Sequence, residues 1–391
     1  MRSFFKNSFP FFIFISILVC LSGCAESSDA PENNAEKVSS LELKYATEFS
    51  VDYYEEDIKL INVNDGNRYL VVPERLKEEA DFDEKKLNDR FGEAVIIYGP
   101  SENVYLAASS AFDMFVKLQA LDKVKACSTK EKDISIDEFR ERCSDGKISY
   151  VGKYSAPDYE ALLNMNCDLA IESTMIYHAP QIKEQLFTLG IPVVVERSSY
   201  EATPLGRLEW IKFYGALFNL EKEAEEYFDS QCLVVEKLEE KLNDLSRENE
   251  VKVAFFYISS AGYVNVRKPG DYITGMIETA GGTYVPDMEL SEEDNALSTI
   301  NINWEDFYAG ALDADIIIYN GTIDNTVVTL DDLYGKNPLF ADFKAVKEGN
   351  VWCTDLNMFQ ETGSVGDVMM DLYRVINNEH EGETVFLRHL E

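Results

Sequence analysis

The spacing of apolar residues predicts a chain that begins with a β-hairpin and continues as strands alternating with helices. Residues 58–63 and 68–72 form two apolar runs, and Asp65-Gly66 between them is typical of a tight hairpin turn. We therefore expect residues 41–92 to form an N-terminal region that contains a β-hairpin.

A first α/β segment is predicted at residues 93–219. Its strands are expected at the short apolar runs 94–98, 169–171 and 193–195, and its helices at residues 107–120 and 180–189. Alternation of this kind is typical of a mainly parallel sheet with helices on both faces.

One long helix separates this segment from a second α/β segment. Apolar residues recur at steps of three and four through a charged background, which predicts an amphipathic helix over residues 220–248. Residues 249–391 return to the alternation, with strands expected at 253–258 and 316–319 and a helix near 271–280. The pattern as a whole predicts an α/β fold of two lobes linked by one long helix.

The two predicted lobes share a local construction. Ser155-Ala-Pro-Asp158 is typical of a capping box, and the helix that it starts carries Glu160 and leads to the strand at 169–171. Asn303-Trp-Glu-Asp306 starts a helix that carries Glu305 and leads to another buried strand. The two carboxylates occupy corresponding first turns, which favours two similar lobes that face each other.

Residues 1–23 have the order of a secretory signal peptide, with a basic start and an apolar run at 9–19 that is too short to span a bilayer. Leu21-Ser-Gly-Cys24 resembles the lipobox of bacterial lipoproteins, so we expect lipid on Cys24 and an extracytoplasmic chain anchored to the cell membrane. The alternative is an ordinary signal peptide with an incidental cysteine. The polar residues 24–40 predict a flexible tether.

Composition narrows the classes of partner. The chain has 36 Lys and Arg against 71 Asp and Glu, a formal net charge of −35. Nucleic acid binding requires concentrated positive charge, so the balance argues against it, and it also argues against a body that lies on anionic lipid. Solubility outside the cell is a sufficient explanation for the excess of acid.

Five cysteines remain after the signal peptide and the anchor: Cys127, Cys143, Cys167, Cys232 and Cys353. Their number is odd and their spacing is not that of a metal site. Cys127 and Cys143 flank a polar segment and could form a disulfide in an oxidising compartment, or remain as reduced buried thiols.

Three stretches carry a family resemblance: Tyr159-Glu-Ala-Leu-Leu-Asn-Met-Asn-Cys-Asp-Leu-Ala-Ile171, Asn337-Pro-Leu-Phe-Ala-Asp-Phe-Lys-Ala-Val-Lys-Glu-Gly-Asn-Val351, and Pro204-Leu-Gly-Arg-Leu-Glu-Trp210 with Ala280-Gly-Gly282. From about Val95 onward the chain resembles the substrate-binding lipoproteins of ABC importers, in the class that serves iron–siderophore, haem and corrinoid uptake. The resemblance implies a bilobed periplasmic-binding-protein-like fold, a monomer without enzymatic activity or cofactor, and an ABC permease with its ATPase as partners. Residues 41–92, the region of the N-terminal hairpin, do not match the simplest members of this class of binding proteins.

By that resemblance, Glu160 and Glu305 match the acidic residues, one in each lobe, that dock into arginine pockets of the permease. Two separated carboxylates on a rigid body fix its orientation, because carboxylate–arginine pairs are directional. The alternative is that each glutamate only complements the dipole of its own helix.

A ligand is expected beyond the carboxyl ends of the strands, where two facing lobes form a cleft. The candidate ligand-binding residues are Tyr98, Ser173, Tyr177, His178, Arg197, Tyr200, Tyr263, Arg267, Tyr319 and Phe359. Tyrosines and hydroxyls suit a bulky, oxygen-rich chelate. Arg267 and Lys268 could meet an anionic ligand. The alternative for most of these residues is ordinary loop polarity.

His178 is the one histidine before the last dozen residues and could bind haem or a metal, although a lone histidine is more often a surface residue. Zinc or manganese receptors need several converging ligands, so the sequence predicts no such metal site.

We therefore expect the protein to capture a metal chelate. A ferric siderophore is the first candidate ligand, and a corrinoid or haem are the alternatives. The lobes are expected to move little on binding. A sensor or adhesion lipoprotein of the same fold is a further alternative, as is an extracytoplasmic enzyme. The sequence carries no Gly-x-Ser-x-Gly, His-Glu-x-x-His or P-loop motif to favour the enzyme.

Overall fold

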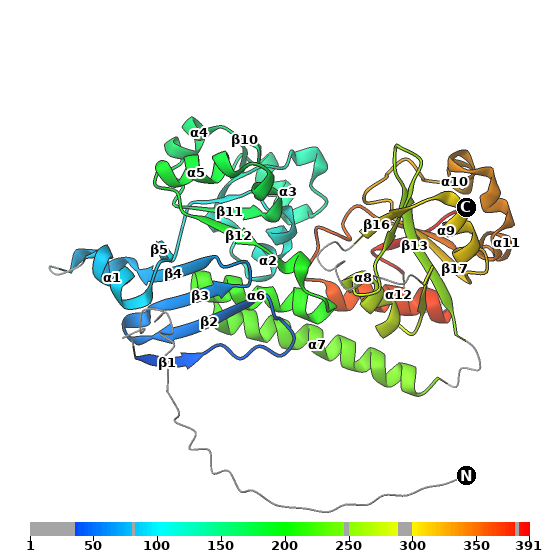
Figure 1. The fold of residues 1–391 in the computed structure, drawn as a ribbon, viewed down its shortest axis with the longest axis horizontal. Coiled ribbons are helices and arrows are strands. Elements are labelled where there is room, and N and C mark those ends of the chain that lie inside the picture. The colour runs from blue at the N-terminus through cyan, green and yellow to red at the C-terminus, as the bar shows by residue number, and fades with distance from the viewer. Residues whose placement is uncertain (1–35, 80–82, 246–249, 288–298, 380–382) are drawn as a thin grey trace, which may run out of the picture.

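The computed structural model describes residues 36–79, 83–245, 250–287, 299–379 and 383–391. Cys24, the predicted signal peptide and most of the predicted tether lie outside the described residues. The described chain forms an N-terminal sheet and two α/β lobes. The lobes lie above one long helix, and the N-terminal sheet lies at the left-hand end of that helix (Figure 1).

The N-terminal sheet has the strands β1 (Lys37–Ser40), β2 (Phe49–Tyr54), β3 (Lys59–Val63), β4 (Arg68–Pro73) and β5 (Val95–Gly99). Strands β1 to β4 are antiparallel neighbours, so the predicted hairpin is confirmed, and Gly66 in its turn has a φ of 88°. The helix α1 (Glu84–Phe91) and a 3₁₀ turn at Glu74–Glu78 cover one face of this sheet.

Strand β5 corrects the expected boundary of the first lobe. The strand forms where the sequence predicts it, but it pairs in parallel with β4, from Tyr69 opposite Val95 to Pro73 opposite Gly99. This pairing buries Ile97 in the core beneath the N-terminal sheet. The N-terminal unit therefore extends to Gly99 rather than ending at residue 92.

The first lobe is built on a parallel sheet in the order β12-β11-β6-β7-β8. Its elements are β6 (Val104–Leu106), α2 (Phe112–Lys117), β7 (Val124–Cys127), α3 (Asp137–Ser144), β8 (Ser149–Tyr150), β9 (Gly152–Lys153), β10 (Ala156–Pro157), α4 (Tyr159–Asn164), β11 (Leu169–Ser173), α5 (Pro180–Thr188) and β12 (Val193–Glu196). The predicted helix at 107–120 is shorter than expected: Ser109–Ala111 form a 3₁₀ turn before α2, and Gln119, with a φ of 55°, lies just beyond its end.

The second lobe has a larger mixed sheet in the order β16-β14-β13-β17-β18-β19, with β15 also paired to β13. Its elements are β13 (Lys252–Ile258), β14 (Val264–Arg267), α8 (Tyr272–Thr279), β15 (Thr283–Val285), β16 (Thr299–Ile302), α9 (Trp304–Ala311), β17 (Ile316–Tyr319), α10 (Leu330–Lys336), α11 (Lys344–Glu348), β18 (Val351–Thr354), α12 (Val365–Asn377) and β19 (Leu387–His389). The strands β13, β15, β17 and β18 are parallel, as predicted.

Polar caps start the two corresponding helices. Asn303 caps α9, where its side-chain oxygen accepts a hydrogen bond of 2.8 Å from Asp306 N. In α4 the cap is Asp158, which accepts from Ala161 N at 3.0 Å, so Ser155 is not the capping residue that the sequence suggested. Asp158 takes this role because Ala156 and Pro157 are already paired in β10.

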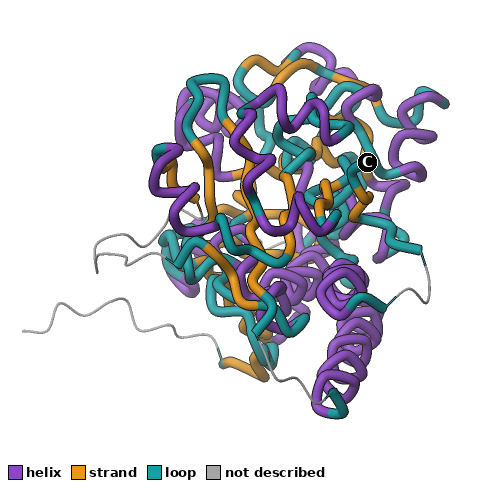
Figure 2. Tube along the Cα trace, turned by 90° about the vertical axis from the view of Figure 1, so that its right-hand side faces the viewer, coloured by secondary structure: helices purple, strands orange, loops and turns teal. Residues whose placement is uncertain are grey.

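Two helices join the lobes. The helix α6 (Pro204–Phe218) is buried along nearly its whole length, and α7 (Glu221–Asn243) buries one face that includes Phe228, Val235 and Leu238. Figures 1 and 2 show α7 at the base of the molecule, beneath both lobes. The predicted linking helix is thus confirmed between the lobes.

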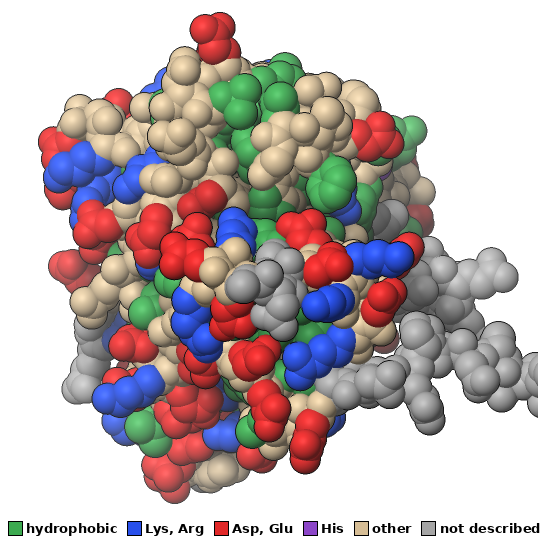
Figure 3. Space-filling model, turned by 90° about the vertical axis from the view of Figure 1, so that its left-hand side faces the viewer, with side chains coloured by type: hydrophobic (Ala, Val, Ile, Leu, Met, Phe, Trp, Pro, Cys, Tyr) green, Lys and Arg blue, Asp and Glu red, His purple; other side chains and the backbone are tan. Residues whose placement is uncertain are grey.

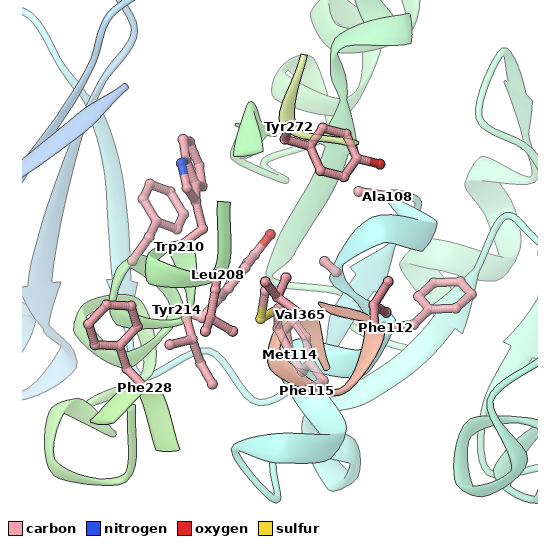
Figure 4. Packing of buried hydrophobic residues seen from close by; sticks show 14 of the residues in the cluster. Ala108, Phe112, Met114, Phe115, Leu208, Trp210, Tyr214, Phe228, Tyr272 and Val365 are labelled. Carbon is pink, nitrogen blue, oxygen red and sulfur yellow. The ribbon is translucent and has the colours of Figure 1, made fainter. Parts of the chain in front are cut away.

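One hydrophobic cluster contains residues of both lobes, beside separate clusters within the second lobe, the first lobe and the N-terminal sheet. Figure 4 shows Phe115 of the first lobe next to Tyr214 of α6, with 5.8 Å between their ring centres, and Val365 of α12 beside them. Packed cores have few voids and transmit displacements directly. Independent movement of the lobes would have to break this core.

Two buried carboxylates, Glu209 in α6 and Glu201 just before it, accept hydrogen bonds from the backbone of residues 44–48, which precede β2. Glu209 accepts hydrogen bonds from the backbone N–H groups of Lys44, Tyr45 and Ala46, at 2.8–3.1 Å. Glu201 accepts from the next two N–H groups along the chain and from Trp210 Nε1 at 2.9 Å. A buried carboxylate is stable only when it is hydrogen-bonded or paired, so this segment is a fixed part of the fold.

The face of the molecule in Figure 3 has mixed charge, and the described cysteines form no disulfide. On the end formed by the N-terminal sheet, acidic side chains are interspersed with lysines and arginines (Figure 3). The five described cysteines are free. Cys127 and Cys143 are hydrogen-bonded to each other as thiols, which together with burial raises the pKa of Cys127, and no disulfide joins them.

Candidate functional site

The loop that follows β18 connects the second lobe to the first. The Gln360 side chain accepts a hydrogen bond of 2.9 Å from Ser135 N and donates one of 2.8 Å to Asp133 O. Thr362 Oγ1 donates to Ser110 O at 2.5 Å. These bonds attach the lobes to each other at the boundary where their strand ends face.

A buried carboxylate of the first lobe completes this attachment. Asp113 in α2 is 1% exposed and accepts a hydrogen bond of 2.8 Å from Gly363 N. Burial raises its pKa to about 6, although Lys117 at 3.5 Å favours the charged form. A Cβ at Gly363 would lie 2.8 Å from Asp113 Oδ2, so only glycine allows this close approach.

A cluster of two arginines and two aromatic rings, Arg207, Arg267, Tyr272 and Phe359, also lies at the boundary. The guanidinium of Arg207, from α6, lies 4.3 Å from the ring centre of Tyr272 in α8. The guanidinium of Arg267, from β14, lies 5.3 Å from the ring centre of Phe359. Figure 4 shows the Tyr272 hydroxyl directed toward Ala108, which follows the end of β6. The cluster therefore lies on the side where the first-lobe strands end.

Four of the predicted ligand-binding residues lie in two groups. Arg267 and Phe359 meet in the cluster just described. Tyr177 and Arg197 instead meet the tip of the N-terminal hairpin, where the Tyr177 hydroxyl and the Arg197 guanidinium both contact Asp65. Arg197 also forms an ion pair of 2.8 Å with Glu48. These two side chains attach the N-terminal sheet to the first lobe, a use that the sequence did not predict.

Two other predicted residues are not at the boundary. Tyr98 belongs to β5 in the N-terminal sheet, where its hydroxyl donates to Glu84 at 2.5 Å and Lys77 lies 3.6 Å from its ring centre. Tyr319 is fully buried in the core of the second lobe and donates to Asp324 at 2.6 Å. Both expectations are corrected: β5 pairs with β4, and Tyr319 faces inward from the middle of its sheet.

The remaining predicted residues are in loops or turns. Ser173 caps the 3₁₀ turn Thr174–His178 by accepting from Met175 N at 3.3 Å, and His178 at the end of that turn is exposed. Tyr263 is 52% exposed, and Tyr200 is 37% exposed with the Arg197 guanidinium 4.0 Å from its ring centre. Lys268 is buried next to Arg267. A role of these residues in binding stays a prediction.

Glu160 and Glu305 both lie in the first turns of their helices, α4 and α9, as predicted. Both side chains are exposed, and within the described ranges neither takes part in a hydrogen bond or an ion pair. Their carboxylates are therefore available to a partner protein.

Buried charged groups at two places escaped the sequence prediction. Arg207 lies in α6 with two other buried charges, Glu209 and Lys212, and Glu172 directly follows the apolar run of β11. Glu172 is 0% exposed, its two carboxylate oxygens have no hydrogen-bond partner in the described structure, and burial raises its pKa to about 8. The signal in each case was a charged residue within a largely hydrophobic segment, a position that costs free energy unless the charge is paired or neutralised.

The described residues contain neither a membrane-spanning helix nor a cluster of metal ligands. No described helix is long and apolar enough to cross a membrane. No group of three or more His, Cys, Asp or Glu side chains is arranged to hold a metal ion in the ranges that the structure covers.

Comparison with known proteins agrees with this architecture. The sequence signature of the family described as periplasmic binding protein matches residues 104–356. Two uncharacterised lipoproteins of Methanocaldococcus jannaschii are 26% and 24% identical, over 93% and 94% of this chain and 91% and 94% of theirs.

Solved structures share the fold at low identity. A periplasmic binding protein of Veillonella parvula superposes with a TM-score of 0.56 at 21% identity, over 72% of this chain and 92% of its own. A periplasmic haem-binding protein of Pseudomonas aeruginosa gives 0.57 at 15% identity, over 74% and 98%. An Fe³⁺-hydroxamate transport protein of Saccharomonospora viridis gives 0.54 at 18% identity, over 73% and 96%.

Proposed function

The chain belongs to the periplasmic binding protein family, whose members are binding proteins rather than enzymes, and on that premise we propose that it is the substrate-binding lipoprotein of an ABC importer. It captures a metal chelate, a ferric siderophore, outside the cytoplasm and delivers it to the permease. Lipid on Cys24 holds it at the membrane, a proposal that the names of the two lipoprotein relatives support.

One observation carries this proposal most directly. The molecule has two lobes on a shared core, and each lobe carries an exposed, unpaired carboxylate in the first turn of the corresponding helix. A rigid body with two such points can be oriented on a permease by two charge-assisted pairs. The iron-chelate and haem receptors that share the fold support a chelate as cargo.

A haem is the second candidate cargo. His178 is exposed at the end of the 3₁₀ turn that follows β11, next to Tyr177, which is 41% exposed. Imidazole and phenolate are both axial ligands of haem iron. Spectra of the protein with added haemin would show a new Soret band that His178→Ala removes if this second candidate is correct.

The ligand is best found by thermal melting in the presence of ferric siderophores, haemin and corrinoids. We expect one ferric siderophore to raise the melting temperature, because a ligand at 100 times its Kd stabilises a folded protein by about 2.7 kcal/mol. The iron-free siderophores and ferric citrate serve as controls. If no compound in the panel shifts the transition, the proposed cargo class is wrong.

Binding should change the shape of the molecule little. The continuous core and the Gln360 and Thr362 contacts attach the lobes to each other, so we expect small-angle scattering to give the same radius of gyration with and without the identified chelate. The double variant Gln360→Ala with Asp113→Ala, which removes the side-chain hydrogen bonds of Gln360 and Asp113 between this loop and the first lobe, is the comparison in which movement should increase. A large compaction of the wild-type protein would contradict the prediction.

A further inference from the structure

Two cysteine side chains of the first lobe, Cys127 and Cys143, lie in contact inside the fold. Cys127 ends the strand β7, and Cys143 lies in the last turn of the helix α3. Their thiols are hydrogen-bonded to each other, although residues 128–142 separate them in the sequence. The other three described cysteines lie in the turn before β11, in α7 and in β18. Within the described part of the chain, the fold therefore brings these two thiols together.

The backbone on both sides of this contact is fixed by the fold. Cys127 pairs with Tyr150 of β8, and its carbonyl oxygen accepts a hydrogen bond of 3.1 Å from Val151 N. The helix α3 is held by Phe139, which is buried and stacks on Phe112 of α2 with 4.0 Å between the ring centres. A disulfide requires two cysteines whose backbones are already close, and here both are fixed with their sulfur atoms in contact.

The two thiols differ in their exposure. Cys127 is fully buried, whereas Cys143 is partly exposed and can be reached from solvent. The hydrogen bond with Cys127 lowers the pKa of Cys143, against burial and the charge of Glu131, which raise it. A thiolate, rather than a thiol, attacks a disulfide. Cys143 is therefore the sulfur that an external oxidant would meet first.

We propose that Cys127 and Cys143 are joined by a disulfide in the exported protein, and that this bond fixes the segment of the first lobe that holds the second lobe. The inference takes from the proposed function only the location outside the cytoplasm, where thiols meet oxidants. The Cys143 thiolate attacks one sulfur of an external disulfide, whose other sulfur leaves as a thiolate. Cys127 loses its proton and attacks Cys143 in the mixed disulfide, which releases the second thiolate. The external disulfide thus gains the two electrons and two protons that the cysteines lose.

The segment between the two cysteines carries contacts to the second lobe. Asp133 O accepts a hydrogen bond of 2.8 Å from the Gln360 side chain, and Ser135 N donates one of 2.9 Å to the same side chain. The disulfide would close residues 127–143 into a ring, which lowers the conformational entropy of the segment when it is detached. The bond should therefore favour the conformation in which Asp133 and Ser135 hold Gln360.

The test uses the full-length lipoprotein, extracted from membranes without reductant and treated with oxidised glutathione. We expect trypsin to release the peptides 126–130 and 143–147 joined to each other, with the other three described thiols alkylated in the unfolded protein before reduction. Reduction should lower the melting temperature by about 5 °C, because a closed ring of this length typically adds several degrees of thermal stability. It should also speed hydrogen exchange at the amides of residues 128–142.

Two variants separate the covalent bond from a packing contact. Cys143→Ala removes the bond at its partly exposed end, so the melting temperature of this variant should match that of the reduced wild type and should not respond to reductant. Cys232→Ala, at another partly exposed cysteine that lies on α7 outside the pair, is the matched control and should keep the response of the wild type.

Absence of the joined peptides after treatment with oxidised glutathione would mean that the pair stays as two hydrogen-bonded thiols, and it would overturn the inference. A disulfide whose reduction changes neither the melting temperature nor hydrogen exchange would overturn its role in holding the lobes. Neither result bears on the proposed cargo or on docking, which are tested with chelates and with the transporter ATPase.

Discussion

Replacing Glu160 and Glu305 together by glutamine is expected to abolish stimulation of the transporter ATPase while leaving the affinity for the chelate unchanged. Both carboxylates are exposed and without a partner in the described structure, so their loss should not disturb the fold. Removing one partner of a desolvated charge pair at an interface costs about 2–5 kcal/mol. Two such losses would weaken docking by at least about a thousandfold.

The measurement is ATP hydrolysis by the permease and ATPase reconstituted in nanodiscs, titrated with wild-type and double-variant protein. The control is the double variant Glu223→Gln with Glu240→Gln, which removes the same charge from exposed positions of α7, on the side of the molecule opposite α4 (Figure 1). Normal stimulation by the Glu160 and Glu305 double variant would exclude the docking role and leave only the effect of each glutamate on its own helix dipole.

Glu172→Gln is expected to stabilise the protein at alkaline pH and to have no effect at pH 4.5 or below. Burial raises the pKa of Glu172 from its ordinary value to about 8, so the folded state favours the neutral carboxyl. The stability that this group contributes is complete below the unfolded pKa of about 4.5 and is lost as pH rises through 8. At pH 9 the charged carboxylate should cost on the order of 4 kcal/mol, which glutamine avoids.

Thermal melting between pH 4.5 and 9 checks this. The difference between the wild-type and Glu172→Gln transitions should grow to several degrees at the alkaline end. Glu184→Gln, an exposed position on α5 of the same lobe, is the control and should follow the wild type at every pH. Parallel curves for Glu172→Gln and wild type would mean that Glu172 is charged and solvated in the folded protein.

Glu160 and Glu305 could be identified from the sequence, whereas Glu172 could not. Glu160 and Glu305 were found from the sequence because each follows a helix cap, and capping is a local interaction over three or four residues. Even there the local signal misidentified one cap, since β10 uses the residues after Ser155. Glu172 and Arg207 were missed because their burial depends on segments distant in the chain.

Apolar periodicity and turn chemistry were enough to predict the two α/β segments, the long α7 between them and the hairpin β3–β4, because both are properties of neighbouring residues. Contacts between distant segments account for the rest: β5 joins the N-terminal sheet, Tyr177 and Arg197 meet the hairpin tip, and Arg207 and Arg267 both lie near Tyr272. Strand pairing and the burial of a charge depend on contacts between segments that are far apart in the sequence. The local pattern of residues does not identify these partner segments.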